Sequence, residues 1–111
     1  MKLRINWADP VIPKEEVLQI QPTDMDDFYA AASDLDKSNL FFVLLTSAHY
    51  YGDRGDNICA SHLYFLAANY LFIALTPPGS YDLSLHYMKK AIALNPLRDY
   101  QDWLALMEKG N

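Results

Sequence analysis

An apolar segment from Ile58 to Leu75 constrains the fold of this chain more than any other feature. A helix of this length would be apolar on every side, so it needs apolar surroundings on all its faces. A membrane-spanning helix and a central core helix wrapped by its neighbours both meet that need. Ser61, His62 and Asn69 interrupt the segment, and no basic residues flank it closely, so we expect a core helix and no membrane span.

Glycine and proline divide the remaining chain into segments of helical length. Turns are expected at Gly52–Asp56, Thr76–Gly79 and Asn95–Pro96, because such residues break helices or accept unusual backbone angles. Neither residue type occurs between Thr23 and Tyr51, but the polar run at 33–38 favours a break. The sequence therefore predicts an all-α fold of antiparallel helical hairpins, with about five helices at 23–36, 39–51, 58–75, 81–94 and 99–109.

Polar residues at the expected helix starts predict the capping interactions. Thr23 and Asp26 have the spacing of a capping box, with Asp in place of the usual Glu. The candidate caps of the later helices are Asp36 or Ser38, Asn57 and Ser80.

The first 22 residues differ from the rest and are expected to form an extended arm (1–22) before a single helical domain (23–111). Apolar residues alternate with polar ones at Leu3, Ile5 and Trp7, and prolines follow. A lone strand is unstable, so the arm either lies across the helices with Trp7 as an anchor or pairs with another chain in a homo-oligomer. Residues 14–20 could add one helical turn after Pro13.

The charge of the chain is acidic and unevenly distributed. Fourteen acidic and nine basic residues give a formal net charge of −5, which argues against a nucleic-acid partner. The whole of this charge lies in residues 1–56, which hold ten acids and five bases. Either these acids form a solvated face with helix-start aspartates, or they form an acidic surface that attracts basic partners.

One cysteine and the character of the N-terminal residues bear on the compartment. Cys59 has no partner for an internal disulfide, which favours a reducing environment. The first residues lack the apolar run of a secretory signal peptide. We therefore expect a cytoplasmic protein.

The segment Gly79–Pro96 carries the most specific pattern in the chain. After an aromatic residue and an acid it places a small residue, a large residue, an alanine and a final proline, which are Ser84, Met88, Ala91 and Pro96. The spacing puts the first three on one helix face, where small side chains let a neighbouring helix approach closely. This segment resembles the second helix of a tetratricopeptide repeat.

Weaker parts of the same pattern occur upstream. Residues 39–50 resemble the first helix of the repeat, and Ala60, Tyr64 and Ala67 repeat the small, large, alanine spacing. The two copies are 24 residues apart, whereas tetratricopeptide units recur at about 34, so the chain is tetratricopeptide-like rather than a regular array. The resemblance implies an α-α superhelix with a groove for a partner protein or peptide, closed by a capping helix at 99–109.

Five tyrosines are candidates for contacts in that groove, because each joins a large apolar area to a hydroxyl group. They are Tyr50, Tyr51, Tyr81, Tyr87 and Tyr100. Most phenylalanines, Phe41 and Phe42 among them, are expected in the core instead.

A thiol and two imidazoles raise a metal-site alternative. Cys59 and His62 are about one helical turn apart, and His86 lies on a later helix; such ligands could hold Zn or Cu. No phosphate-binding glycine loop is present, and no cofactor is expected.

These features predict a non-catalytic interaction module, either an adaptor or a small chaperone-like subunit, that binds a peptide or helix of a partner. Two alternatives remain open at this point. One is an obligate subunit or homodimer of a larger complex, and the other is a small metal-binding enzyme that uses Cys59, His62 and His86.

Overall fold

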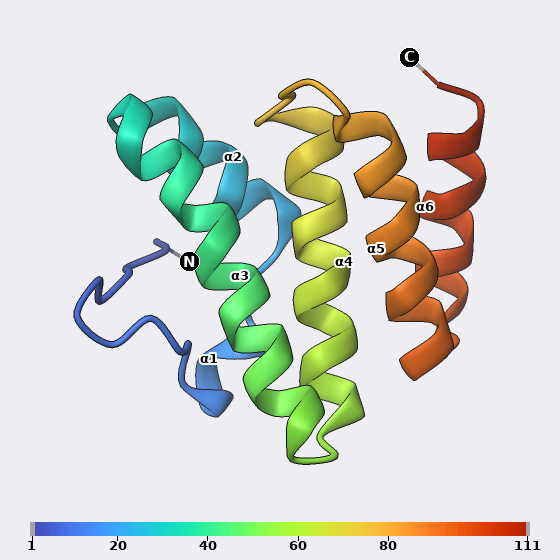
Figure 1. The fold of residues 1–111 in the computed structure, drawn as a ribbon, viewed down its shortest axis with the longest axis horizontal. Helices are drawn as coiled ribbons and strands as arrows, with labels where there is room; N and C mark the ends of the chain where they lie inside the picture. Colours follow the sequence, from blue (N-terminus) through green and yellow to red (C-terminus); the bar gives the residue numbers. More distant parts are fainter. Residues whose placement is uncertain (1, 111) are drawn as a thin grey trace.

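Six α-helices form in residues 2–110, the part of the chain that the computed structural model describes (Figure 1). No strand occurs in this part, so the expected all-α class is confirmed. The helices exceed the expected five because residues of the arm form one short turn of helix. The elements are α1 (Lys14–Val17), α2 (Pro22–Ala31), α3 (Asp34–Asp53), α4 (Asn57–Ile73), α5 (Ser80–Leu94) and α6 (Arg98–Glu108).

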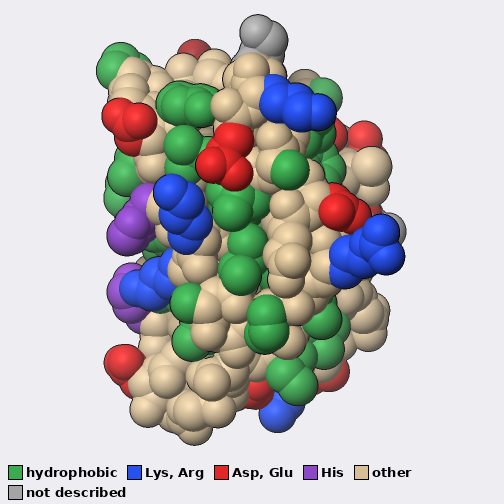
Figure 2. All heavy atoms as spheres, turned by 90° about the vertical axis from the view of Figure 1, so that its right-hand side faces the viewer, with side chains coloured by type: hydrophobic (Ala, Val, Ile, Leu, Met, Phe, Trp, Pro, Cys, Tyr) green, Lys and Arg blue, Asp and Glu red, His purple; other side chains and the backbone are tan. Residues whose placement is uncertain are grey.

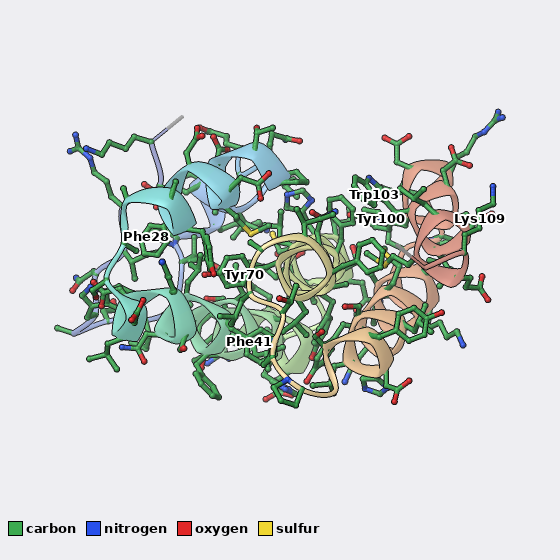
Figure 3. The ribbon with its side chains drawn as sticks, turned by 90° about the horizontal axis from the view of Figure 1, so that it is seen from above. Phe28, Phe41, Tyr70, Tyr100, Trp103 and Lys109 are labelled. Atoms are coloured by element: carbon green, nitrogen blue, oxygen red, sulfur yellow. The ribbon has the colours of Figure 1, made fainter. Side chains whose placement is uncertain are left out.

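Helix α4 lies at the centre and is buried without interruption from Cys59 to Phe72. The view from above shows α3 and α5 on one side of α4, and α2 and α6 on the other (Figure 3). Burial of each large apolar side chain of α4 stabilises the fold by about 1.5–3 kcal/mol. The expected core helix is confirmed. No helix in residues 2–110 has the length and the apolar character needed to cross a membrane.

The turns expected from glycine and proline are confirmed. Helix α3 ends before Gly55, α4 ends before the two prolines at 77 and 78, and α5 ends before Asn95–Pro96. Gly79 has φ +82°, a left-handed conformation that is easy for glycine and strained for other residues. Because these turns are short, successive helices from α3 to α6 run in alternating directions (Figure 1).

The expected break near residues 33–38 occurs earlier than the sequence indicated. The chain is extended at Ala32 and Ser33, and α3 begins at Asp34 rather than at Asn39. Ser33 is the cap, because its Oγ accepts a hydrogen bond from the backbone N–H of Asp36 at 3.2 Å. Asp36 and Ser38, which were candidate caps, therefore lie inside α3.

Other predicted caps are also displaced by one or two residues. The capping box of α2 joins Gln21 and Asp24 instead of Thr23 and Asp26, and Asp24 Oδ2 accepts from the Gln21 N–H at 2.8 Å. Asp56 rather than Asn57 caps α4, and Gly79 rather than Ser80 precedes α5. The Asp56 carboxylate accepts from the Cys59 N–H at 3.1 Å, whereas α5 has no side-chain cap.

The arm lies across its own helices. The Ile12 N–H donates to Ser47 Oγ at 2.9 Å, and the Tyr51 hydroxyl donates to the Ile12 carbonyl. The Trp7 ring contacts Phe28 edge to face at 6.4 Å, although 44% of Trp7 remains exposed. Helix α2 already begins at Pro22, and the outermost positions of the expected segments 1–22 and 23–111, Met1 and Asn111, lie outside the described residues.

Candidate functional site

A series of ring contacts joins α3, α4 and α5 on one side of the molecule. The ring of Phe42 lies 5.6 Å from Phe41, and Phe41 lies 6.0 Å from Tyr87. Tyr87 stacks on Tyr64 at 6.0 Å with 7° between the ring planes, and His49 meets Tyr64 edge to face at 5.9 Å. We use the name α3–α5 face for the surface formed by Phe41, Phe42, His49, Tyr64, His86, Tyr87 and Lys90.

The rings of the α3–α5 face differ strongly in exposure. Tyr64 is 3% exposed and forms the base, Tyr87 is half-buried, and Phe42 is 62% exposed. Tyr87 and Lys90 reach the same face because residues three or four positions apart lie on one side of a helix. The face thus combines a buried aromatic base with a phenylalanine that is largely exposed to water.

A lysine and two histidines lie beside these rings. The Lys90 Nζ atom lies 4.8 Å from the centre of the Tyr64 ring, within range of a cation–π interaction. His86 contacts Tyr87 edge to face at 5.1 Å, and the Nδ1 atom of His49 lies 3.4 Å from the Tyr64 hydroxyl. His86, Lys90 and His49 are all exposed. Figure 2 shows His side chains beside Lys or Arg side chains along its left edge, which is the front of Figure 1.

The structure does not bring the five candidate tyrosines together. Tyr87 belongs to the α3–α5 face, whereas Tyr50 lies near the end of α3, where its ring contacts Tyr51 and stacks against Arg54 at 3.6 Å. Tyr81 is 44% exposed, and its hydroxyl lies 3.4 Å from the Glu108 carbonyl oxygen.

The other two candidates are core residues in this fold. The Tyr51 hydroxyl donates a hydrogen bond to the Ile12 carbonyl of the arm, and burial raises the pKa of that hydroxyl. Tyr100 is 4% exposed and stacks on Phe65 of α4 at 4.8 Å. Figure 3 shows Tyr100 and Trp103 between α6 and α4, away from Phe41.

The residues that carry the repeat-like pattern lie on α4 and α5, except for the proline. Contact between α4 and α5 is the most extensive of the fold. All the helical members are buried, and Pro96 is exposed in the turn between α5 and α6. They are Ala60, Tyr64 and Ala67 on α4, and Ser84, Met88 and Ala91 on α5.

Two features of the α3–α5 face were missed in the sequence. Phe42 was expected in the core, but the apolar run around it is longer than one helix face can bury. The positive charge was visible in the sequence, because residues 38–52 and 83–94 contain Lys89 and Lys90 but no carboxylate. The same segments contain two histidines.

The three residues of the metal alternative do not converge. Within residues 2–110, no three His, Cys, Asp or Glu side chains are grouped so that they could hold a metal ion. His62 instead donates from Nε2 to the Ile20 carbonyl at 2.8 Å, and burial lowers its pKa. Burial also raises the pKa of the Cys59 thiol to about 11. His86 is exposed on α5.

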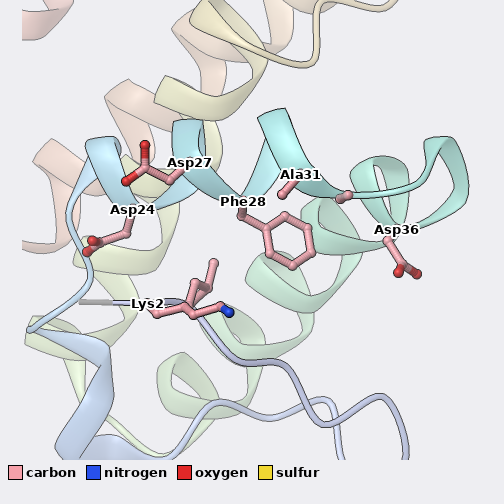
Figure 4. A pocket seen from close by; sticks show the side chains of 8 residues that line it. Lys2, Asp24, Asp27, Phe28, Ala31 and Asp36 are labelled. Carbon is pink, nitrogen blue, oxygen red and sulfur yellow. The ribbon is translucent and has the colours of Figure 1, made fainter.

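A cleft of about 640 Å³ lies beside the arm, away from the α3–α5 face (Figure 4). Its acidic lining comes from Asp24 and Asp27 of α2 and Asp36 of α3, with Lys2 of the arm on the opposite side. Phe28 provides an apolar wall. Three of the ten acidic residues of segment 1–56 line the cleft, but none of the predicted site residues do.

Comparison with known proteins identifies no relative: no family model, curated protein or solved structure matches the chain.

Proposed function

We propose that this chain is a non-catalytic protein–protein interaction module, an adaptor or small chaperone-like subunit, that binds a peptide or helix of a partner at the α3–α5 face. The exposure of Phe42 is the observation that carries the proposal. A phenylalanine that is 62% exposed, and whose ring contacts the half-buried Phe41, is an anchor that a partner can cover.

The packing of the helices supports this proposal. Helices α3 and α5 lie on the same side of α4, and ring contact between Phe41 and Tyr87 joins them. Stacked helical repeats create extended concave surfaces that bind partners, and the resemblance of residues 79–96 to the second helix of a tetratricopeptide repeat supports a similar use of this fold. We propose the tetratricopeptide-like superhelix on this combination of sequence pattern and packing.

A peptide array tests the proposal directly. Purified protein would be applied to an array of peptides of varied sequence, and binding would be compared with that of Phe42→Ala. Loss of a central aromatic anchor weakens binding by about tenfold or more. The matched control is Leu106→Ala on α6, which removes an exposed apolar side chain outside the face. The absence of any ligand that depends on Phe42 would refute the proposal.

The obligate subunit or homodimer is a second candidate, and exposed apolar residues favour it. Leu35 is 70% exposed, Leu106 50% and Ile73 48%, on three different helices. Such side chains can form the core of a permanent interface. The molecular mass in solution, measured over a range of concentrations, distinguishes this candidate. A monomer at every concentration would exclude the homodimer.

A further inference from the structure

We propose that the occupant of the α3–α5 face is an acidic peptide segment with one aromatic or large aliphatic anchor. This inference rests on the proposed function and adds the chemistry of the partner. Three observations support it: the charges on α3 and α5, the absence of an ion pair at Lys90 among the described residues, and the exposed apolar residues beside these charges.

The local charge of the α3–α5 face is opposite to that of the whole protein. Two segments form the sides of the face, residues 38–52 of α3 and residues 83–94 of α5. They contain two lysines and two histidines and no Asp or Glu, although the chain as a whole carries −5. The intervening α4 carries no Asp, Glu, Lys or Arg. At physiological salt, charges are screened beyond about 8 Å, so a peptide in the middle of this face would experience mainly the two lysines.

Neither lysine is neutralised within the described part of the chain. The ion pairs found there are Lys14 with Asp56 and Lys37 with Asp34, both outside the face. The Tyr64 ring holds Lys90 by its face, which leaves the N–H groups of the ammonium able to donate. The nearest acids in the sequence lie just outside these two segments: Asp53 is the last residue of α3, and Asp82 is in the first turn of α5. A carboxylate from a partner can therefore meet an available cation in the middle of the face.

Apolar side chains beside the cations fix the other half of the partner's chemistry. Phe42 is 62% exposed, and Leu83, one turn before Tyr87 on α5, is 40% exposed. An aromatic or large aliphatic side chain that covers such exposed apolar surface removes it from water. A nucleic acid matches the face less well, because strong phosphate binding needs many more basic residues than these and the protein as a whole is negative.

The test uses labelled peptides that share the same aromatic and leucine positions and differ only in their charged positions, which are all Glu, all Gln or all Lys. A single-stranded RNA oligonucleotide of similar length serves as the nucleic-acid probe. Binding is followed by fluorescence anisotropy, first near about 0.15 M salt and then at higher salt. The Glu peptide is expected to bind most tightly and to weaken as salt is added.

Charge reversal locates the interaction. The double variant Lys89→Glu with Lys90→Glu should weaken binding of the Glu peptide about fivefold to tenfold. Lys109→Glu is the matched control, because it reverses an exposed charge beyond the end of α6 and should leave the affinity unchanged. Urea unfolding of each variant confirms that the fold is retained.

The results separate this inference from the proposed function. Tightest binding by the Lys peptide or by RNA, or a Glu peptide indifferent to the double reversal, overturns the acidic partner. So does failure of the Glu peptide to bind. In each case ligands from the array that depend on Phe42 would still support an interaction module. If neither the array nor the peptides yield a ligand that depends on Phe42, the proposed function itself is wrong.

Discussion

The Nε2 atom of His62 lies 2.8 Å from the carbonyl oxygen of Ile20, and this hydrogen bond fastens α4 to the segment between α1 and α2. Because a carbonyl oxygen can only accept, Nε2 carries the hydrogen. The ring is 9% exposed, and burial lowers its pKa, although the bond to Ile20 acts in the opposite direction.

The first prediction is a loss of stability in mild acid. In the unfolded chain His62 takes up a proton near the ordinary pKa of about 6.5, whereas the folded protein takes it up at lower pH. Between these values the unfolded state binds more protons, so the free energy of unfolding falls as the pH drops below about 7 and levels off below the folded pKa. Urea unfolding across this range measures the effect.

His62→Gln isolates the contribution of this ring. Its amide can donate to Ile20 without titrating, so the slope in this pH window should largely disappear. His86→Gln on the surface is the matched control and should keep the slope of the unmodified protein. A slope unaffected by His62→Gln would mean that another group titrates on unfolding.

A second prediction concerns the start of α4. Asp56 Oδ1 accepts from the Cys59 N–H, and Asp56 Oδ2 pairs with Lys14 Nζ at 3.0 Å. Asp56→Ala should lower the free energy of unfolding by about 1 kcal/mol. Asp56→Ser should recover most of the loss, because serine can cap without the ion pair. The control is Asp53→Ala at the C-terminal end of α3, which should cost less. A larger loss of stability in Asp53→Ala than in Asp56→Ala would contradict the assignment of the cap.

The same carboxylate has its own pH signature. The backbone hydrogen bond from Cys59 and the pairing with Lys14 hold the pKa of Asp56 below its ordinary value, despite burial. Its contribution is therefore complete above about pH 4 and is lost as the pH falls through the folded pKa. Unfolding curves of Asp56→Ser and the unmodified protein should converge at the acid end. Curves that stay parallel throughout would argue against this ionisation.

A third prediction is that Cys59 is chemically inert in the folded protein. The side chain is 1% exposed, and burial, followed by the neighbouring Asp56, raises the thiol pKa to about 11. At neutral pH almost no thiolate forms, and a disulfide reagent should react only as the protein unfolds. Reaction rates with and without urea provide the measurement. Rapid stoichiometric reaction without urea would show that Cys59 is accessible.

A fourth prediction tests the close approach of α4 and α5. Ala91 is fully buried on α5, the helix that has the most extensive contact with α4, whereas Ala93, two residues further, is exposed. Ala91→Leu should overpack the interface and cost about 1–3 kcal/mol, and Ala93→Leu should cost little. Thermal and urea unfolding compare the two variants. Equal stability of both would mean that the helices do not approach closely at Ala91.

The fold could be predicted from local signals where those signals were strong. The turns after α3, α4 and α5 followed from glycine and proline, because these residues restrict or free the backbone wherever they occur. The break before α3 had neither residue. It depends on two extended residues and the Ser33 cap, and several nearby polar residues offered the same capping chemistry.

The candidate site was less predictable because it depends on contacts between distant residues. Tyr51 was expected to face a partner, but its hydroxyl meets the Ile12 carbonyl, 39 positions away in the chain. Tyr100 was also expected to face a partner, but its ring stacks on Phe65 of α4. The positive character of the α3–α5 face follows from two separate segments that together contain two lysines and no carboxylates. Their shared charge becomes evident only when the fold places the two segments side by side.

The burial of α4 from Cys59 to Phe72 has a consequence for synthesis of the protein on the ribosome. Helices α5 and α6, which cover one flank of α4, follow it in the chain. At about 5–20 residues per second, a nascent chain spends several seconds with that flank of its most apolar helix uncovered. During this interval the growing chain presents a surface for chaperone capture or aggregation, and the arrival of α5 and then of α6 ends the exposure.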